Sequence, residues 1–218
     1  MGQAIAESIG QSAEFELTGI WRRGGDIDGL LAQSDLVIDF SLPEGTARVL
    51  QAVMDHGRPL VCGVSGLSES QVELLGRASG RVPVVYDRNM SLGIAVLERS
   101  VRAAATALGA DFDVEIAEVH HLQKKDAPSG TALMLGKAIA ESRGESGTGA
   151  IRFAVERRGE VPGNHAITMS TATEKLTFAH SVTTRQVFVD GALRAAHWVI
   201  DQPPGQYSMQ DVLFGGLK

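Results

Sequence analysis

Short apolar runs alternate with amphipathic stretches through the first half of the chain. The runs around Val37, Val61 and Val84 are apolar nearly throughout, as are strands that are covered on both faces. The intervening stretches have helical periodicity and begin with residues that favour a helix start, Pro43 and Ser68. This alternation predicts a doubly wound, Rossmann-type parallel sheet. The expected strands are 14–21, 36–40, 59–64 and 82–86, and the expected helices are 43–56 and 68–78.

The pattern changes after a helical stretch at 91–108, which we expect to link two domains. Phe112, Val114 and Ile116 alternate with Asp113 and Glu115, which predicts a strand with one solvated face. The rest indicates an α+β domain with an open, mixed or antiparallel sheet. The expected strands are 111–121, 151–156, 165–171 and 174–181, and the expected helices are 130–142 and 186–198. We expect residues 1–91 and 204–218 to form the first domain and residues 92–203 the second.

Composition narrows the range of partners. The net charge of the 218-residue chain is -6, which argues against binding to a nucleic-acid backbone because that requires a basic face. The single cysteine, Cys62, lies in an apolar run and is expected to be a buried thiol. No apolar stretch approaches the ~20 residues that span a bilayer, and the first residues lack a signal-peptide pattern. These features predict a cytoplasmic protein with a small-molecule partner and no membrane contact.

The stretch 118–132, EVHHLQKKDAPSGTA, holds the candidate chemistry. His120 and His121 end a predicted strand, where one imidazole could donate a proton and the other could bind a carboxylate. Lys124 adds a positive charge or a second proton donor. Ser129, Gly130 and Thr131 open a helix, where backbone N–H groups and the helix dipole favour an anion. The combination predicts a site for a small dicarboxylate.

A metal site is not expected here. Glu118 and the two histidines are spaced i, i+2 and i+3, which on a strand places them on different faces, and no further ligand is evident. The remaining histidines show no grouping in the sequence and are expected to be surface or satisfied core residues. They are His56, His165, His180 and His197. The run Arg157-Arg158-Gly-Glu is expected to be a solvated turn.

The motif E-x-H-H-x-x-K-x-D-A-P-S-G-T-A resembles the signature of the dihydrodipicolinate reductase family of diaminopimelate and lysine biosynthesis. The resemblance extends over most of the chain, through the segments DFSLPEG (39–45), GVSG (63–66), NMSLG (89–93) and the pattern from Arg185 to Trp198. It implies that hydride passes from NADH or NADPH to a cyclic imine with two carboxylates. It also implies a homotetramer formed through the open sheet of the second domain.

The resemblance assigns roles residue by residue. It implies His120 and Lys124 as proton donors, and His121, Ser129, Gly130 and Thr131 as ligands of the substrate carboxylates. No metal is implied. The residues expected at the cofactor are Met1, Trp21, Arg22, Gly63, Val64, Ser65, Asp87, Arg88, Asn89 and Met90.

Two features depart from the family pattern. Family members begin with a strand and a G-x-x-G-R-M-G loop, and Met1-Gly2 matches only the last two residues of that loop. We therefore expect this chain to bind NAD(P)H more weakly than a version extended by about 15 to 20 residues, one strand plus a turn. Where NADH-binding proteins carry an acidic residue, this chain has Trp21-Arg22-Arg23. Arginine there favours the 2′-phosphate of NADPH.

Two rival functions remain open at this point. One is a different nicotinamide dehydrogenase of related architecture, such as an enzyme acting on an amino acid, which substrate profiling would distinguish. The other is a non-catalytic protein that keeps the carboxylate site but lacks a working cofactor loop. Calorimetry with a pyridine dicarboxylate and with NADPH would identify it, because only the dicarboxylate would bind.

Overall fold

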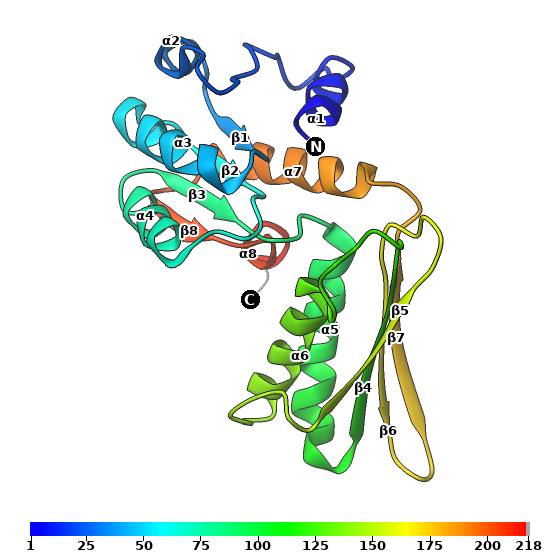
Figure 1. Cartoon of the computed structure of the whole chain (residues 1–218). Helices are drawn as coiled ribbons and strands as arrows, with labels where there is room; N and C mark the ends of the chain where they lie inside the picture. The colour runs from blue at the N-terminus through cyan, green and yellow to red at the C-terminus, as the bar shows by residue number, and fades with distance from the viewer. Residues whose placement is uncertain (217–218) are drawn as a thin grey trace. The chain divides into compact units, whose positions relative to one another are not determined.

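The computed structural model describes residues 1–216 and divides the chain into two compact units (Figure 1). The first unit comprises Met1–Leu92 and the segment that begins at Gln186, and the second comprises Gly93–Arg185. Each described part contains one four-stranded sheet. The Rossmann-type sheet and the second, mixed sheet expected from the sequence are therefore both present.

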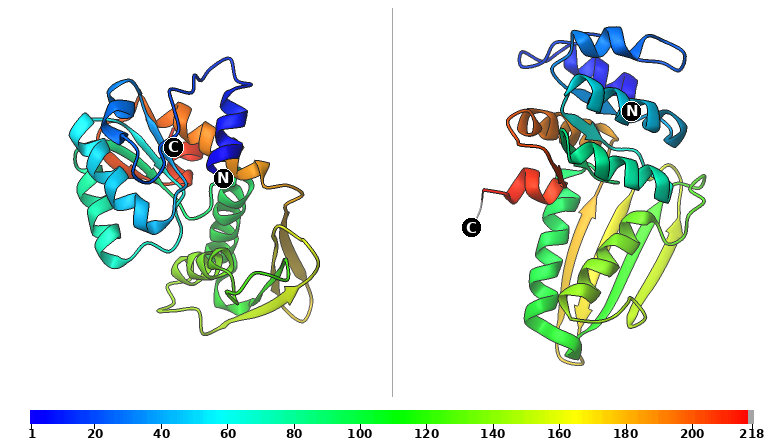
Figure 2. Two further views of the ribbon diagram at one scale, coloured as in Figure 1. Left: turned by 45° about the horizontal axis from the view of Figure 1, so that its top comes forward. Right: turned by 90° about the vertical axis from the view of Figure 1, so that its left-hand side faces the viewer.

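Sheet A of the first unit is parallel, with strand order β1-β2-β3-β8. Leu60, Cys62 and Val84 point to one face, where they pack against α3 and α4. The helix α7 contacts β2 and β3 from the other face (Figures 1 and 2). The elements are α1 (Gly2–Ile9), α2 (Ile27–Ala32), β1 (Val37–Asp39), α3 (Pro43–His56), β2 (Leu60–Cys62), α4 (Glu69–Ser79), β3 (Pro83–Tyr86), α7 (Gln186–Val199), β8 (Gly205–Tyr207) and α8 (Met209–Phe214).

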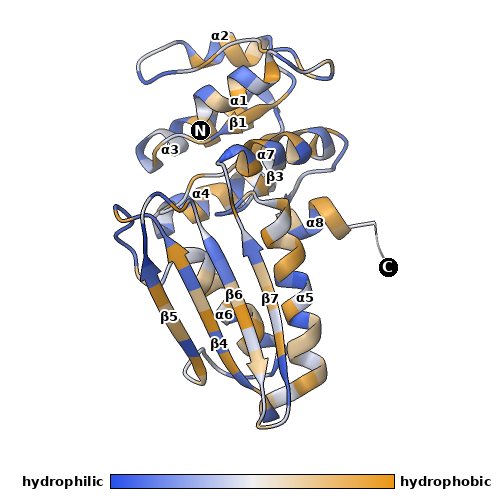
Figure 3. Ribbon diagram, turned by 90° about the vertical axis from the view of Figure 1, so that its right-hand side faces the viewer, coloured by the Kyte–Doolittle hydropathy of each residue, from blue (hydrophilic) through white to orange (hydrophobic). Residues whose placement is uncertain are grey.

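Sheet B of the second unit has the order β5-β4-β6-β7, in which β5 is parallel to β4 and the other neighbours are antiparallel. One face packs against α5 and α6 through Val114, Ile116 and Ile167. Figure 3 shows the other face, which no helix of this unit covers. The elements are α5 (Leu92–Leu108), a 3₁₀ turn (Gly109–Asp111), β4 (Asp113–His120), α6 (Gly130–Ser142), β5 (Ile151–Arg157), β6 (Asn164–Ser170) and β7 (Lys175–Ser181).

Two expectations need correction. Residues 14–21 form no strand; in the described sheet β1 is an edge strand and pairs only with β2. The helix α7 groups with the first unit, whereas the sequence placed it in the second domain. Its buried residues Val189 and Ala192 pack with Ile5 of α1 and with Ile38 of β1, and the helix also contacts β2 and β3. No helix within residues 1–216 has the length and hydropathy needed to cross a bilayer.

Candidate active site

The strand β4 carries its candidate residues on the face that packs against the helices. Val114, Ile116, Glu118 and His120 are all buried there, while the residues between them are partly exposed. The period of two therefore places Glu118 and His120 on one face, not on two. The alternation does not extend to His121, because β4 ends at His120.

A buried cluster forms around the carboxylate of Glu118, which is 2% exposed. His165 lies directly opposite it on β6. Oε2 of Glu118 is 3.6 Å from Nδ1 of His120 and 3.7 Å from Nε2 of His165. The two imidazole rings meet edge to face, with centroids 5.1 Å apart. His165 is therefore part of the site, and the prediction that it stands alone is wrong.

Arg157 ties this cluster to the loop that follows β4. Its guanidinium is 3.4 Å from Oε1 of Glu118 and donates hydrogen bonds to the carbonyls of Lys124 and Asp126. The side chain is 19% exposed, so the expectation of a solvated turn is wrong for Arg157. Arg158 is exposed, with its side chain 3.4 Å from Glu156. Arg157 thus holds both the buried carboxylate and the backbone that positions Lys124.

The start of α6 is capped by side chains of this same region. Oγ of Ser129 accepts a hydrogen bond from the N–H of Ala132, and the N–H of Ser129 donates to Oε1 of Glu118 at 3.0 Å. The N–H of Gly130 donates to Oδ2 of Asp126, whose other oxygen is 2.7 Å from Nζ of Lys124. Lys124 and the opening of α6 are therefore joined through one carboxylate. A substrate carboxylate that bound to both groups would replace the carboxylate of Asp126.

Burial and charge shift the ionisation of these groups. Burial lowers the pKa of His120, although the charge of Glu118 opposes this effect, while Lys124 and Arg157 reinforce it. Burial and the neighbouring His120 lower the pKa of His165 to about 4. Burial raises the pKa of Asp126, but the hydrogen bond and charge of Lys124 outweigh it and the net shift is downward. His165 is therefore neutral at pH 7. The pKa of His120 is set by a balance between burial, which lowers it, and the charge of Glu118, which raises it.

The ligand atoms of Glu118, His120 and His165 lie within 4.8 Å of one another, a spacing at which one metal ion could contact all three. The geometric argument against a metal was therefore wrong, because Glu118 and His120 share a face. However, Oε1 of Glu118 already accepts the N–H of Ser129 and pairs with Arg157. A second cation beside this guanidinium would be repelled. We interpret the cluster as a hydrogen-bonding one, and the absence of a metal stays a prediction.

His121 has different surroundings from His120. It is half-buried, and its Nδ1 lies 3.0 Å from Oε1 of Gln123. Thr131 lies in the first turn of α6, beside Gly130. The sequence predicted roles for His120, Lys124 and Ser129, which stay predictions, but it did not indicate that Arg157, His165 and Asp126 contact this group of residues. The alternation along β4 was a usable signal for Glu118, whereas the cross-strand position of His165 was not.

The expected cofactor residues of the first unit follow the carboxyl ends of its strands. In open α/β sheets this is the edge at which nucleotides bind. Gly63, Val64 and Ser65 follow β2, and Asp87, Arg88, Asn89 and Met90 follow β3. Val64 and Met90 are only 2% and 1% exposed, so these two could offer backbone atoms alone. A Cβ at Gly63 would lie 2.4 Å from the ring of Phe40, so its bare backbone serves packing.

The other cofactor candidates lie before β1. Met1 is the N-cap of α1, whose first turn has no side-chain cap, so its N–H groups suit a phosphate. Trp21 is half-buried against the core, and its Nε1 donates to the carbonyl of Gly25 at 3.1 Å. Arg22 is exposed. The carboxylate of Asp87 accepts the N–H groups of Asn89 and Met209, which indicates a structural role for that side chain.

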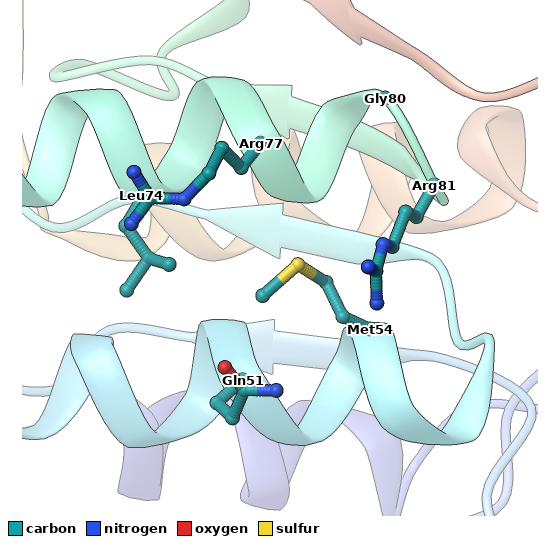
Figure 4. A pocket seen from close by; sticks show the side chains of 6 residues that line it. All are labelled: Gln51, Met54, Leu74, Arg77, Gly80 and Arg81. Atoms are coloured by element: carbon teal, nitrogen blue, oxygen red, sulfur yellow. The ribbon is translucent and has the colours of Figure 1, made fainter.

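A separate cavity of about 480 Å³ lies between α3 and α4 (Figure 4). Its walls come from the C-terminal halves of both helices and from Gly80 and Arg81, which precede β3. This is the amino end of the strands, opposite the edge described above. The cavity therefore takes no part in the chemistry discussed here.

Comparisons with known proteins agree with this architecture. The family model described as "Dihydrodipicolinate reductase, N-terminus" matches residues 1–90, and the one described as "Dihydrodipicolinate reductase, C-terminus" matches residues 93–213. The chain belongs to the dihydrodipicolinate reductase family. The expectation drawn from the motif around His120 is thereby confirmed.

Individual relatives cover nearly the whole chain. The 4-hydroxy-tetrahydrodipicolinate reductase of Zymomonas mobilis is 39% identical over 98% of this chain and 92% of its own length. That of Halorhodospira halophila is 40% identical over 97% of this chain and 85% of its own. The dipicolinate-bound dihydrodipicolinate reductase of Paenisporosarcina sp. TG-14 has the same fold, with a TM-score of 0.80 at 20% identity, covering 98% of this chain and 94% of that one.

Proposed function

We propose that this chain reduces 4-hydroxy-tetrahydrodipicolinate, or its dehydrated form, to tetrahydrodipicolinate with NAD(P)H, in diaminopimelate and lysine biosynthesis. Membership of the family over both units supports this reaction. The observation that carries the mechanism is the buried His120, which lies beside Glu118, the carboxylate that binds the N–H of Ser129 at the start of α6, and within reach of the charge of Lys124. The chain is accordingly an oxidoreductase.

The residues of the site have two kinds of role, proton donation and binding of the substrate carboxylates. The 4-hydroxy compound first loses water, which gives a ring with a conjugated C=C–C=N system. When bound, the nicotinamide would supply a hydride to one end of this system. Charge balance then requires one proton at the other end, and His120 supplies it, with Lys124 as a second donor. The protonated Lys124, the N–H groups of Gly130 and Thr131, and the side chains of Ser129 and His121 bind the two substrate carboxylates.

The dicarboxylate assignment is supported from two directions. The structural relative from Paenisporosarcina is described with dipicolinate bound. In this chain, the carboxylate of Asp126 already lies between Lys124 and the N–H of Gly130. An aspartate side chain is a small model of the carboxylate that we place there. Binding of the substrate would release Asp126 to solvent, where it is already half-exposed.

We assign the cofactor to the carboxyl edge of sheet A, with Met1, Gly63, Val64, Ser65, Asp87, Arg88, Asn89 and Met90 around it. Arg22 and Arg23 both have exposed side chains that form no ion pair within residues 1–216, and we place one of them on the 2′-phosphate of NADPH, with Trp21 beside the adenine. Replacing Arg22 and Arg23 together by serine should lower kcat/KM for NADPH and not for NADH. Arg81→Ser, at an exposed arginine on the other edge of the sheet, is the control. An NADH preference in the wild-type chain would refute this assignment.

The test of the reaction is direct. The substrate is generated enzymatically in the cuvette, and the loss of nicotinamide absorbance is followed with the wild-type chain and with His120→Asn. The wild-type chain should oxidise NAD(P)H only when the substrate is present. Calorimetry with pyridine-2,6-dicarboxylate tests the binding site independently of the cofactor. Cofactor oxidation that does not depend on the dicarboxylate would contradict the proposal.

A further inference from the structure

The two carboxylate oxygens of Glu118 differ in their hydrogen bonding: Oε1 has partners and Oε2 has none within residues 1–216. Oε1 accepts the N–H of Ser129 at 3.0 Å and pairs with Arg157 at 3.4 Å. Oε2 is buried and makes no hydrogen bond within residues 1–216. A buried carboxylate oxygen without a donor is costly, so a neighbouring N–H should satisfy it.

Two imidazoles are in position to do so. Nδ1 of His120, at 3.6 Å, is itself buried and has no hydrogen-bond partner in the described chain. Nε2 of His165, at 3.7 Å, has the hydroxyl of Ser129 at 3.3 Å as an alternative partner. A hydrogen bond from Nδ1–H of His120 to Oε2 of Glu118 would therefore satisfy both atoms. A small rotation of the ring shortens it to a hydrogen bond.

The opposite side of the ring is kept clear. A Cβ at residue 163 would lie 3.0 Å from Nε2 of His120, so a side chain there would press on this nitrogen, and Gly163 has none. The edge-to-face contact with His165 restrains the ring plane. If Nδ1 donates to Glu118, then Nε2 is the nitrogen that gains and loses the proton.

Charged groups from four elements face His120: Glu118 on β4, Arg157 on β5, His165 on β6, and Lys124 and Asp126 in the loop before α6. Lys124 and Arg157 disfavour the imidazolium, as does burial. Glu118 is the buried anion that opposes them at close range. Removing this anion should therefore lower the pKa of His120 further.

We propose that Glu118 is a positioning residue: its carboxylate holds Nδ1–H of His120, so that Nε2 delivers the proton in the reaction proposed above. The catalytic part of this role, delivery of the proton, rests on the proposed function. The tautomer and the ionisation of His120 are properties of the folded chain and can be measured without any turnover.

The first experiment is nitrogen NMR of the histidine rings in the full chain, with the His120 signals assigned by their loss in His120→Asn. In the wild-type chain, neutral His120 should carry its proton on Nδ1. In Glu118→Gln this preference should weaken and the pKa of His120 should fall, because the anion is gone. A proton on Nε2 in neutral wild-type His120 would overturn the proposal without any variant.

Glu115→Gln is the matched control. Glu115 lies three residues earlier on β4 and pairs with an arginine of β5, Arg152, at 2.6 Å, but it faces away from the cluster. Its replacement should leave the His120 signals unchanged. Equal effects of the two substitutions would contradict a specific role of Glu118. If Glu118→Gln does not fold, Glu118→Asp, which withdraws the charge by one methylene, should shift the tautomer balance in the same direction.

Kinetics then separate this role from the proposed function. Glu118→Gln should lower kcat on the order of 100-fold, as misplaced catalytic groups do, change KM much less, and move the alkaline decline of kcat/KM to lower pH. A wild-type chain that is inactive while its NMR signals behave as expected would refute the proposed function alone. Zinc that survives dialysis in the wild-type chain and is lost in Glu118→Gln would overturn the positioning role, since the carboxylate would then be a metal ligand.

Discussion

At the scale of single residues, the site consists of ionisable side chains that are buried next to one another. Sequence reasoning identified His120 and Lys124 because histidine pairs and lysine next to a helix start are chemically conspicuous. It could not identify His165, because the contact with Glu118 comes from the register between β4 and β6, which are joined by a long connection through α6 and β5. Cross-strand neighbours are fixed by tertiary pairing, which local periodicity does not encode.

The substitution His120→Asn tests the assignment of the proton donor. Loss of a general acid lowers kcat by about 10² to 10⁴, whereas binding of pyridine dicarboxylate should weaken little, because Lys124 and the start of α6 remain. Calorimetry and initial rates measure the two effects. His197→Asn is the control, since His197 is 66% exposed in the first unit. Similar rates for both variants would remove His120 from the mechanism.

The depressed pKa of His165 predicts a pH-dependent stability. Its pKa falls from the model-peptide value of 6.5 to about 4 on folding, so between these values the unfolded chain binds more protons. The stabilisation is therefore complete above pH 6.5 and is lost as the pH falls towards 4. The loss is roughly 3 kcal/mol. Urea titrations at several pH values measure it. His165→Gln should flatten the dependence.

At the scale of elements, local signals predicted helices better than strands. The helices 43–56 and 130–142 begin and end where the sequence placed them, because a proline or a serine marks their first turns and their apolar faces are regular. The expected strand at 14–21 has a suitable composition but no partner in sheet A, so composition alone was insufficient. The parallel pairing of β5 with β4 was equally invisible to local pattern.

The capping box of α4 provides a test at this scale. Oγ of Ser68 accepts the N–H of Gln71 at 3.3 Å, and Oε1 of Gln71 accepts the N–H of Ser68 at 2.9 Å. Ser68→Ala leaves the N–H of Gln71 without this acceptor and should lower the free energy of unfolding by about 1 kcal/mol. Ser100→Ala, within α5, should not destabilise the chain, since alanine favours a helix interior. Denaturant titration measures both, and equal losses would argue against the cap.

At the scale of the whole molecule, the sequence predicted two units but misplaced α7. The helix is covered by residues of α1 and sheet A, and such long-range burial is not visible in its own periodicity. The remaining prediction at this scale, a homotetramer, concerns the open face of sheet B (Figure 3). There, four alanines lie side by side across the strands: Ala117 faces Ala154 and Ala166, and Ala166 faces Ala179.

This row of small side chains makes a flat face that a second copy of the sheet could cover. Stable interfaces bury roughly 1,200 Å² or more, so the contact should extend over much of this face. We therefore expect Ala166→Glu to lower the mass in solution, because symmetry would bring identical buried charges to the interface and each would lack a partner. Light scattering coupled to size-exclusion chromatography measures the mass. Ala103→Glu, on the exposed side of α5 in the same unit, should leave it unchanged. A wild-type chain that is monomeric at micromolar concentration would refute the tetramer, and an unchanged mass for Ala166→Glu would place its interface elsewhere.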